Sequence, residues 1–229
     1  MKLGIIAAMS IEAEQIISAL SEKSVEKVGG IDYTTGKIGN TELVVAVCGI
    51  GKVFAAMCTQ AMIVRFEPDA VINTGVGGTL TKELTIGDAC VSSAVVQHDM
   101  DTSPLGDPVG LISGINIVHI PADEALGDKI IALCTEEGIR AIKGIIASGD
   151  QFIADAGVKE RIVTNFQGKV CEMEGASVGQ VCYVNKVPFV IVRAISDDAD
   201  GDAVEDYPAF AKNSADRSAK VVIRLAQSL

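Results

Sequence analysis

The stretch KLGIIAAMSIEAEQIISAL, residues 2–20, decides the fold class. Residues 2–8 form a nearly continuous apolar run, which is typical of a β-strand buried on both faces of a sheet. Ser10 is suited to N-capping a helix, and acidic residues follow it in the first turn. Apolar side chains then recur at helical spacing as far as Leu20. The stretch therefore predicts a strand followed directly by a helix.

The same alternation continues along the chain. Further buried strands are predicted at 42–48, 70–73, 89–96, 115–119, 144–147, 169–171 and 188–194, and residues 32–38 form a hairpin with 41–48. Helices are predicted at 10–20, 52–66, 123–137, 176–185 and 207–227. No linker or repeat interrupts the 229 residues, so we predict one domain over 1–229: an α/β fold with a large twisted, mostly parallel sheet and helices on both faces.

Composition excludes several function classes. Thirty acidic residues against 19 Lys and Arg give a net charge of −11. Binding to nucleic acid or to an anionic membrane surface requires clustered Lys and Arg, so neither is an expected partner. No apolar run reaches the length of about 18 residues that is needed to span a membrane. The N-terminal apolar run is too short for a signal peptide.

The six cysteines predict a reduced protein. They stand at 48, 58, 90, 134, 171 and 182, and no two have the CxxC spacing of a metal or redox site. We interpret them as free core thiols of a cytoplasmic protein. His98 and His119 have no partner at metal-ligand spacing, so we expect neither a metal nor a cofactor.

Two glycine-rich stretches resemble phosphate-binding loops but lack key positions. Residues 49–52 precede a helix, yet Ala46 and Val53 stand where a P-loop needs Gly and Ser or Thr. Residues 75–78 follow a strand, but Leu80 replaces the last small residue of a dinucleotide fingerprint. Both stretches are tight strand-exit turns, or places where the backbone approaches a small uncharged ligand.

Three carboxylates follow predicted strands, where the ligands of such sheets bind. Glu12 comes after the first strand and Asp197 after 188–194; taken alone, each also fits a structural role at a helix or loop start. The third is Glu174, which lies two residues after Glu172 in an apolar setting, so the two would share one side of a strand. Buried acids are costly unless used, so the set indicates acid/base chemistry on a sugar.

These residues lie in motifs that resemble one family. The motifs are GIIAAMSIEAE at 4–14, CGIGKVFAA at 48–56, INTGVGG at 72–78, SGDQFI at 148–153, CEMEGA at 171–176 and PFVIVRAISDDAD at 188–200. Over nearly its whole length the chain resembles the 5′-methylthioadenosine/S-adenosylhomocysteine nucleosidases of the purine nucleoside phosphorylase superfamily. The resemblance implies a three-layer α/β/α sandwich around a mixed, mostly parallel sheet, and a homodimer.

The resemblance also implies roles for individual residues. Asp197 would be the general acid that protonates adenine N7, Glu12 would activate the attacking water, and Glu174 would bind the ribose hydroxyls. The remaining implied substrate contacts are Met173 on the sugar, Phe152 and Ile153 at the purine, and Met9, Ile50, Val76, Glu172, Arg193, Ser196 and Tyr207 around the same cleft. For Asp197 we expect a raised pKa, from burial and from acidic neighbours such as Asp198.

Water is the expected nucleophile. Phosphate would need Arg or backbone donors, and the first 64 residues, which hold the nucleophile side, contain no Arg. Three alternatives remain: a phosphate-dependent purine nucleoside phosphorylase, a hydrolase of another 5′-modified purine nucleoside, and a non-catalytic nucleoside-binding protein. Val76, Tyr207 and segment 101–113 depart from better-known members of the family, which affects the expected 5′ specificity but not the chemistry.

Overall fold

The computed structural model describes residues 1–199 and 203–229. Its strands are β1 Lys2–Ala7, β2 Ser21–Val28, β3 Ile31–Ile38, β4 Thr41–Val47, β5 Ala70–Thr79, β6 Ala89–Gln97, β7 Ile120–Pro121, β8 Ala141–Ser148, β9 Gly168–Glu172 and β10 Phe189–Asp197. Its helices are α1 Ser10–Ala19, α2 Lys52–Phe66, α3 Glu124–Glu136, α4 Ala156–Phe166, α5 Gly175–Asn185 and α6 Ala203–Gln227, with a short 3-10 turn η1 at Ser103–Leu105. None of these helices is both long and apolar enough to cross a membrane.

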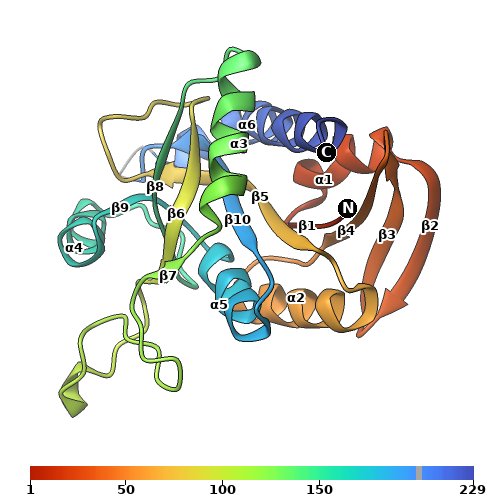
Figure 1. Ribbon diagram of the computed structural model, residues 1–229. Coiled ribbons are helices and arrows are strands. Elements are labelled where there is room, and N and C mark those ends of the chain that lie inside the picture. The colour runs from red at the N-terminus through yellow and green to blue at the C-terminus, as the bar shows by residue number, and fades with distance from the viewer. Residues whose placement is uncertain (200–202) are drawn as a thin grey trace.

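The strands form one mixed sheet that closes on itself at one side. β10 pairs in parallel with β5 and antiparallel with β6, while β9 pairs antiparallel with β5 and in parallel with β8. Because β6 also pairs with β8, the strands β5, β10, β6, β8 and β9 complete a ring. On the other side of β5, the strands β1, β4, β3 and β2 continue as an open wing (Figure 1).

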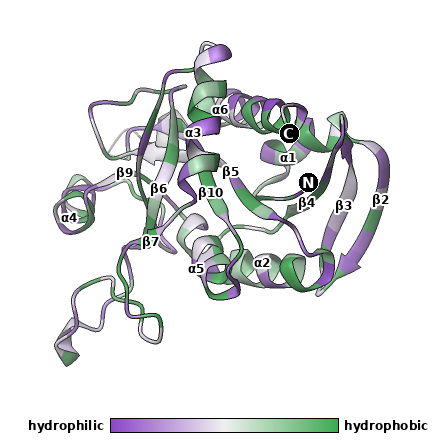
Figure 2. Ribbon diagram, viewed as in Figure 1, coloured by the Kyte–Doolittle hydropathy of each residue, from purple (hydrophilic) through white to green (hydrophobic). Residues whose placement is uncertain are grey.

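Helices cover both faces of this sheet. On one face, α1, α3 and α6 bury side chains such as Ile16, Ile130 and Leu225 against the central strands. On the other face, α2 and α5 contribute Met62 and Cys182 to a second core. β10 is apolar along most of its length, whereas α6 alternates between hydrophobic and hydrophilic residues (Figure 2). The α/β sandwich around a mixed sheet is therefore confirmed.

Some predicted elements were wrong or absent. Residues 115–119 are not a strand: Gly114 and Asn116 have positive φ angles, which break the extended backbone, and the strand begins only at Ile120. β2 was not predicted because it is an exposed edge strand without apolar alternation. The sequence analysis also missed α4, which buries only Ile162 and Phe166.

Candidate active site

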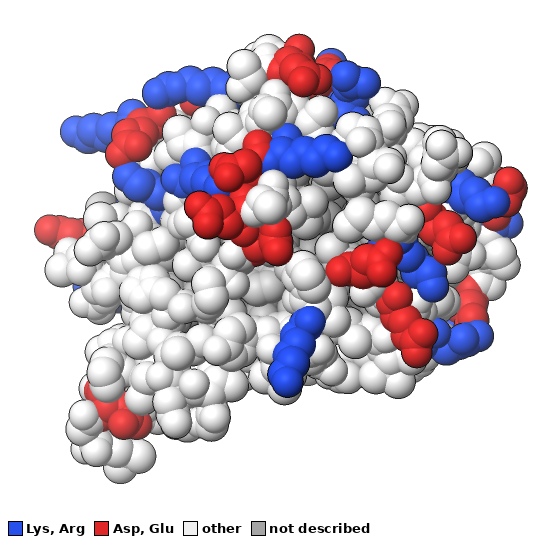
Figure 3. Space-filling model, in the orientation of Figure 1, with Lys and Arg blue, Asp and Glu red and all other residues white. Residues whose placement is uncertain are grey.

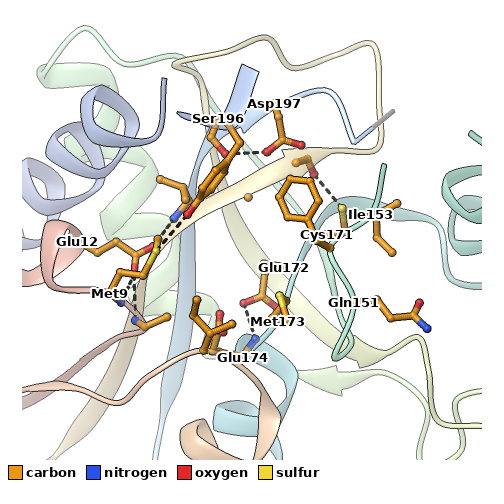
Figure 4. A pocket seen from close by; sticks show the side chains of 17 residues that line it. Met9, Glu12, Gln151, Ile153, Cys171, Glu172, Met173, Glu174, Ser196 and Asp197 are labelled. Carbon is orange, nitrogen blue, oxygen red and sulfur yellow. Dashed lines mark hydrogen bonds between the residues drawn. The ribbon is translucent and has the colours of Figure 1, made fainter. Parts of the chain in front are cut away.

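A cavity of about 280 Å³ opens where β1, β9 and β10 end and beside the last residues of β5 (Figure 4). Every predicted site residue except Arg193 lines it. The lining residues are Ala8, Met9, Glu12, Ile50, Val76, Gly77, Gly78, Gln151, Phe152, Ile153, Cys171, Glu172, Met173, Glu174, Ser196, Asp197 and Tyr207. The chain thus brings residues from seven separate segments together at one edge of the sheet, as strand-end sites do in α/β proteins.

Glu12 is held by three backbone amides. It lies in the first turn of α1, where its Oε2 accepts hydrogen bonds from the N–H groups of Ala8 (3.0 Å) and Met9 (2.9 Å). Its Oε1 accepts one from Val76 N at 3.0 Å, which links the end of β1 to β5. Burial raises the pKa of Glu12, while Arg193 and the amides oppose the rise. The result is a fixed carboxylate with greater basicity than an exposed one.

Arg193 was expected to line the cavity, and the structure contradicts this. Its side chain is fully buried within β10, behind the cavity wall. The guanidinium donates to the Glu172 carboxylate and to Asn73 Oδ1 (2.5 Å), and lies 3.7 Å from Glu174 Oε2. A buried cation requires such partners, since an unpaired one is strongly destabilising. Arg193 therefore orients the acids of the cavity and does not form its surface.

Glu172 is occupied by protein groups. Besides Arg193, its carboxylate accepts hydrogen bonds from the Ser148 hydroxyl and from the backbone N–H groups of Glu174 (3.2 Å) and Gly175 (2.7 Å). These contacts satisfy a buried charge. Glu172 lines the cavity as predicted, but its oxygens hold the start of α5 in place.

Glu174 does not share a strand with Glu172, contrary to the interpretation from the sequence. β9 ends at Glu172, and Glu174 is the N-cap residue of α5. Its Oε1 accepts a hydrogen bond from the Gly51 N–H at 2.8 Å. Burial raises the pKa of Glu174, and the neighbouring charge of Glu172 adds to the rise, against the lowering effects of Arg193 and Gly51.

Asp197 closes β10 on another side of the cavity. Only 3% of it is exposed, its Oδ2 accepts from the Ser196 hydroxyl at 2.9 Å, and its Oδ1 accepts from Ala199 N at 3.0 Å. A Cβ atom at Gly78 would clash with Asp197 Oδ1, so the glycine leaves room for this carboxylate. Figure 4 shows Glu12, Glu174 and Asp197 approaching the cavity from three different sides.

The mouth of the cavity is apolar and aromatic. The rings of Phe152 and Tyr207 meet edge to face with centroids 5.6 Å apart. The Tyr207 hydroxyl donates to Met9 Sδ at 3.1 Å. Phe152 and Ile50 are each about half exposed (49% and 54%), so they frame an open entrance.

Among the lining residues, Gly77 and Gly78 belong to the stretch 75–78, for which an approach of the backbone to a ligand was one interpretation. Three others, Ala8, Gln151 and Cys171, were not singled out from the sequence. Each lies inside a motif quoted above, next to a predicted site residue, and this position in the sequence could have identified it. Burial raises the pKa of the Cys171 thiol, which leaves it protonated and unreactive at neutral pH. Within residues 1–199 and 203–229, no His, Cys, Asp and Glu side chains are grouped so that they could hold a metal ion.

Comparison with known proteins gives the family. Residues 2–227 match the model of the Phosphorylase superfamily. Two 5′-methylthioadenosine/S-adenosylhomocysteine nucleosidases, from Shewanella pealeana and Shewanella sp. strain W3-18-1, are 35% and 37% identical to the chain, with both chains fully covered in each case.

Solved structures agree with this assignment. A Helicobacter pylori futalosine hydrolase has a TM-score of 0.95 at 37% identity, covering 100% of this chain and 98% of its own. A mutant H. pylori methylthioadenosine nucleosidase with 5′-methylthioadenosine in its active site has a TM-score of 0.96 at 35% identity, covering 100% and 99%. The chain belongs to the phosphorylase superfamily, and it is a nucleosidase of 5′-modified purine nucleosides.

Proposed function

We propose that this protein hydrolyses the N-glycosidic bond of 5′-methylthioadenosine and S-adenosylhomocysteine, releasing adenine and a 5′-thioribose. The observation that carries the proposal is the convergence of Glu12, Glu174 and Asp197 on one cavity. All three carboxylates are at least 95% buried, at exposed fractions of 3%, 5% and 3%. Buried carboxylates are suited to proton transfer and to stabilising a sugar cation.

The proposed mechanism gives each carboxylate one task. Asp197 donates a proton to purine N7, so that adenine leaves as a neutral base. Glu12, held by three amides, accepts a proton from the water that attacks the anomeric carbon. Glu174 binds the ribose 2′- and 3′-hydroxyls, and its charge stabilises the oxocarbenium-like transition state. Each proton transfer contributes about 10²–10⁴-fold to the rate.

The charges around the cavity favour water over phosphate as the nucleophile. Among the described residues that line the cavity there is no Lys or Arg, and four lining residues are acids. Arg193, the nearby cation, is already paired with Glu172 behind the wall. A phosphate dianion would therefore meet like charge without a cationic partner, whereas phosphate sites require Arg, Lys or several free amides.

The mouth of the cavity favours a thioether at the 5′ position. Met9, Phe152 and Tyr207 offer a sulfur atom and two aromatic edges, which make favourable contacts with sulfur. Futalosine hydrolysis is the second candidate, because a futalosine hydrolase is equally similar. Methylthioadenosine, with an uncharged tail, is the preferred substrate in this proposal.

We also propose that the chain is one domain that acts as a cytoplasmic homodimer. Val53, Phe54 and Met57 expose at least half of their surface on α2, next to the cavity mouth. The segment between β6 and β7 projects from the body and carries Leu105, 84% exposed (Figure 1). Few charges lie over this segment and α5 (Figure 3). Such a surface fits a second copy, with segment 101–113 reaching toward the partner's 5′ pocket. The free, buried cysteines support a reducing compartment.

The test is base release from methylthioadenosine, S-adenosylhomocysteine and futalosine, each with and without inorganic phosphate. The expected result is adenine release from the two thio-nucleosides at a rate that phosphate does not change, with little turnover of futalosine. A strict need for phosphate would replace the proposal with a phosphorylase, and faster turnover of futalosine would replace the substrate. The Asp197→Asn variant controls for contaminating nucleosidase.

A further inference from the structure

Lys52, the first residue of α2, lies outside the cavity and is held at four points. Its backbone N–H donates to Asp150 Oδ1 at 2.8 Å, and its carbonyl accepts from the Ser177 hydroxyl at 2.7 Å. Its ammonium group contacts Asp99 Oδ1 at 2.6 Å and Gln97 Oε1 at 3.2 Å. Lys52 therefore connects the start of α2 to β6, to α5 and to the loop between β8 and α4.

Asp99 connects the same loop from the other side. Its second oxygen, Oδ2, accepts a hydrogen bond from Asp150 N at 2.9 Å, just before the cavity residues Gln151 and Phe152. The Lys52 and Asp99 side chains are only 20% and 19% exposed, so solvent screens their ion pair less than it screens a surface pair. We call Lys52, Asp99 and Asp150 the Lys52 cluster.

Gly51 connects the Lys52 cluster to Glu174, a carboxylate of the proposed active site. Gly51 directly precedes Lys52, and its N–H donates to Glu174 Oε1 at 2.8 Å. Gly51 has a φ of 100°, and a Cβ there would lie 3.0 Å from Asp150 Oδ1, so only glycine fits this turn. Because Lys52 is fixed on both sides of its peptide, the direction of the Gly51 N–H depends on the cluster.

We infer that Lys52 and Asp99 are positioning residues for substrate binding: their ion pair holds the Gly51 N–H against Glu174 and thereby keeps that carboxylate ionised and aimed at the ribose hydroxyls. The inference rests on the proposed role of Glu174. Nothing in the Lys52 cluster lines the cavity, so its effect passes through Gly51 and through the loop that carries Gln151 and Phe152.

This arrangement has a pH signature. A hydrogen bond from an amide to the charged form of a carboxylate lowers its pKa, so loss of the Gly51 contact raises the pKa of Glu174 further. An ionised Glu174 accepts both ribose hydroxyls, whereas a protonated one accepts them less well. The acidic limb of the pH profile of kcat/KM then moves to higher pH. The titratable or charged groups that face Glu174 from other elements stay in place: Glu12, Cys48, Glu172, Arg193 and Tyr207.

The experiment compares Lys52→Met and Asp99→Asn with Lys143→Met, which removes a lysine ion pair (to Asp128, 2.5 Å) remote from the cavity. Wild-type turnover of methylthioadenosine is measured first, so a failure of the proposed function appears as an inactive wild type. We expect KM to rise about tenfold in both cluster variants, with kcat changed less than about threefold, since one charge-assisted hydrogen bond is disturbed. Lys52→Arg, which keeps the charge, is expected to recover most of the wild-type KM.

A second readout does not need turnover. We expect the dissociation constant of 5′-methylthiotubercidin, a 7-deaza analogue that Asp197 cannot activate by protonating N7, to rise with KM in Lys52→Met.

The acidic limb of the pH profile of kcat/KM is expected to move up by a measurable fraction of a pH unit in Lys52→Met and Asp99→Asn, and not in Lys143→Met. Equal KM and an unmoved limb in wild type and cluster variants would overturn the inference, as would a loss of kcat alone. If Lys52→Met melts early, Asp99→Asn carries the test, with Lys52→Arg as the control that keeps the charge.

Discussion

The hydrogen bonds that Glu12 and Asp197 accept fit the tasks proposed for each. Glu12 accepts hydrogen bonds from three backbone amides, and the Asp197 carboxylate accepts hydrogen bonds from groups that include the Ser196 hydroxyl and the Ala199 N–H. Amide donors hold a carboxylate ionised, as a base requires. A hydroxyl can rotate to donate or accept, so Ser196 accommodates either protonation state of an acid at Asp197.

We expect Asp197→Asn and Glu12→Gln each to lower kcat for methylthioadenosine by at least about 10²-fold, because each removes one proton-transfer step. Both substitutions are isosteric, so the melting temperature and the affinity for 5′-methylthiotubercidin are expected to change little. Adenine release, followed by its absorbance change, checks the first point. Activity in either variant within a factor of about three of wild type would rule out the assigned role.

Glu174 is expected to make stability depend on pH. In the folded protein, burial raises the pKa of Glu174 from its ordinary value of 4.5 to about 7. Between these two pH values the folded protein therefore binds more protons than the unfolded chain. The free energy of unfolding therefore falls as pH rises through this window, and the penalty is complete above it. We expect Glu174→Gln, which cannot ionise, to melt higher than wild type at about pH 8 and at the same temperature near about pH 4.

Calorimetric melting across this range checks the prediction, with Glu14→Gln, an exposed glutamate of α1, as the control that shows no such trend. A Glu174→Gln melting temperature that tracks wild type at every pH would show that Glu174 is not a source of strain. The variant is also expected to lose activity, which would place stability and function in opposition at this residue.

At the residue scale, the sequence analysis located the three carboxylates because each follows a predicted strand. It was wrong about Arg193, because motif membership does not show which way a strand residue points. In β10 the burial of every residue removes the alternation that separates the two faces. The hydrogen bond from Gly51 to Glu174, across 123 positions, has no local signature in the sequence.

At the element scale, the glycines of β5 make room for the acids. A Cβ atom at Gly75 would clash with the Glu12 carboxylate, and one at Gly78 with that of Asp197. The stretch 75–78 is therefore not the strand-exit turn suggested by the sequence: it lies within β5, where it permits two carboxylates to pack against the backbone.

We expect Gly75→Ala to lower kcat at least about tenfold and to destabilise the protein by about 1–3 kcal/mol, the usual effect of overpacking a buried site. Gly127→Ala in α3 is the control, since its nearest neighbour is the flexible end of Lys143 at 3.3 Å. That substitution is expected to leave activity unchanged. Kinetics and chemical denaturation of both variants provide the comparison, and full activity in Gly75→Ala would contradict the packing argument.

Elements were predictable to the extent that they are buried. The strands at the centre of the sheet and the amphipathic helices have continuous or periodic apolar patterns, and α2 begins and ends where predicted. The exposed strand β2 and the weakly buried α4 lack such patterns. For 115–119, an apolar composition pointed to a strand, but a backbone turn at Asn116 overrides it.

At the scale of the whole molecule, the parallel pairing of β1, β5 and β10 brings Glu12 and Asp197 together. Glu12 and Asp197 lie far apart in the sequence, yet β10 pairs in parallel with β5, and β5 pairs in parallel with β1, so their strands end at one edge. Which strands pair is determined by long-range packing, and sequence periodicity carries no information on strand order. The sequence therefore predicts a sheet with helices on both faces, but not the closed ring.

The proposed homodimer is tested on α2. Met57 is half exposed and lies on the same surface as Val53, which is 69% exposed. In a monomer, Met57→Glu would place a charge in water and change stability by less than about 0.5 kcal/mol. In a dimer it would bury a charge in an apolar interface, which is strongly unfavourable.

We expect wild type to sediment at twice the chain mass of 23.8 kDa. Met57→Glu is expected to sediment as the single chain, with reduced activity because segment 101–113 no longer reaches the partner. Val25→Glu, on the exposed strand β2, is expected to remain dimeric and active, and a wild type that sediments as a single chain at micromolar concentration would refute the assembly.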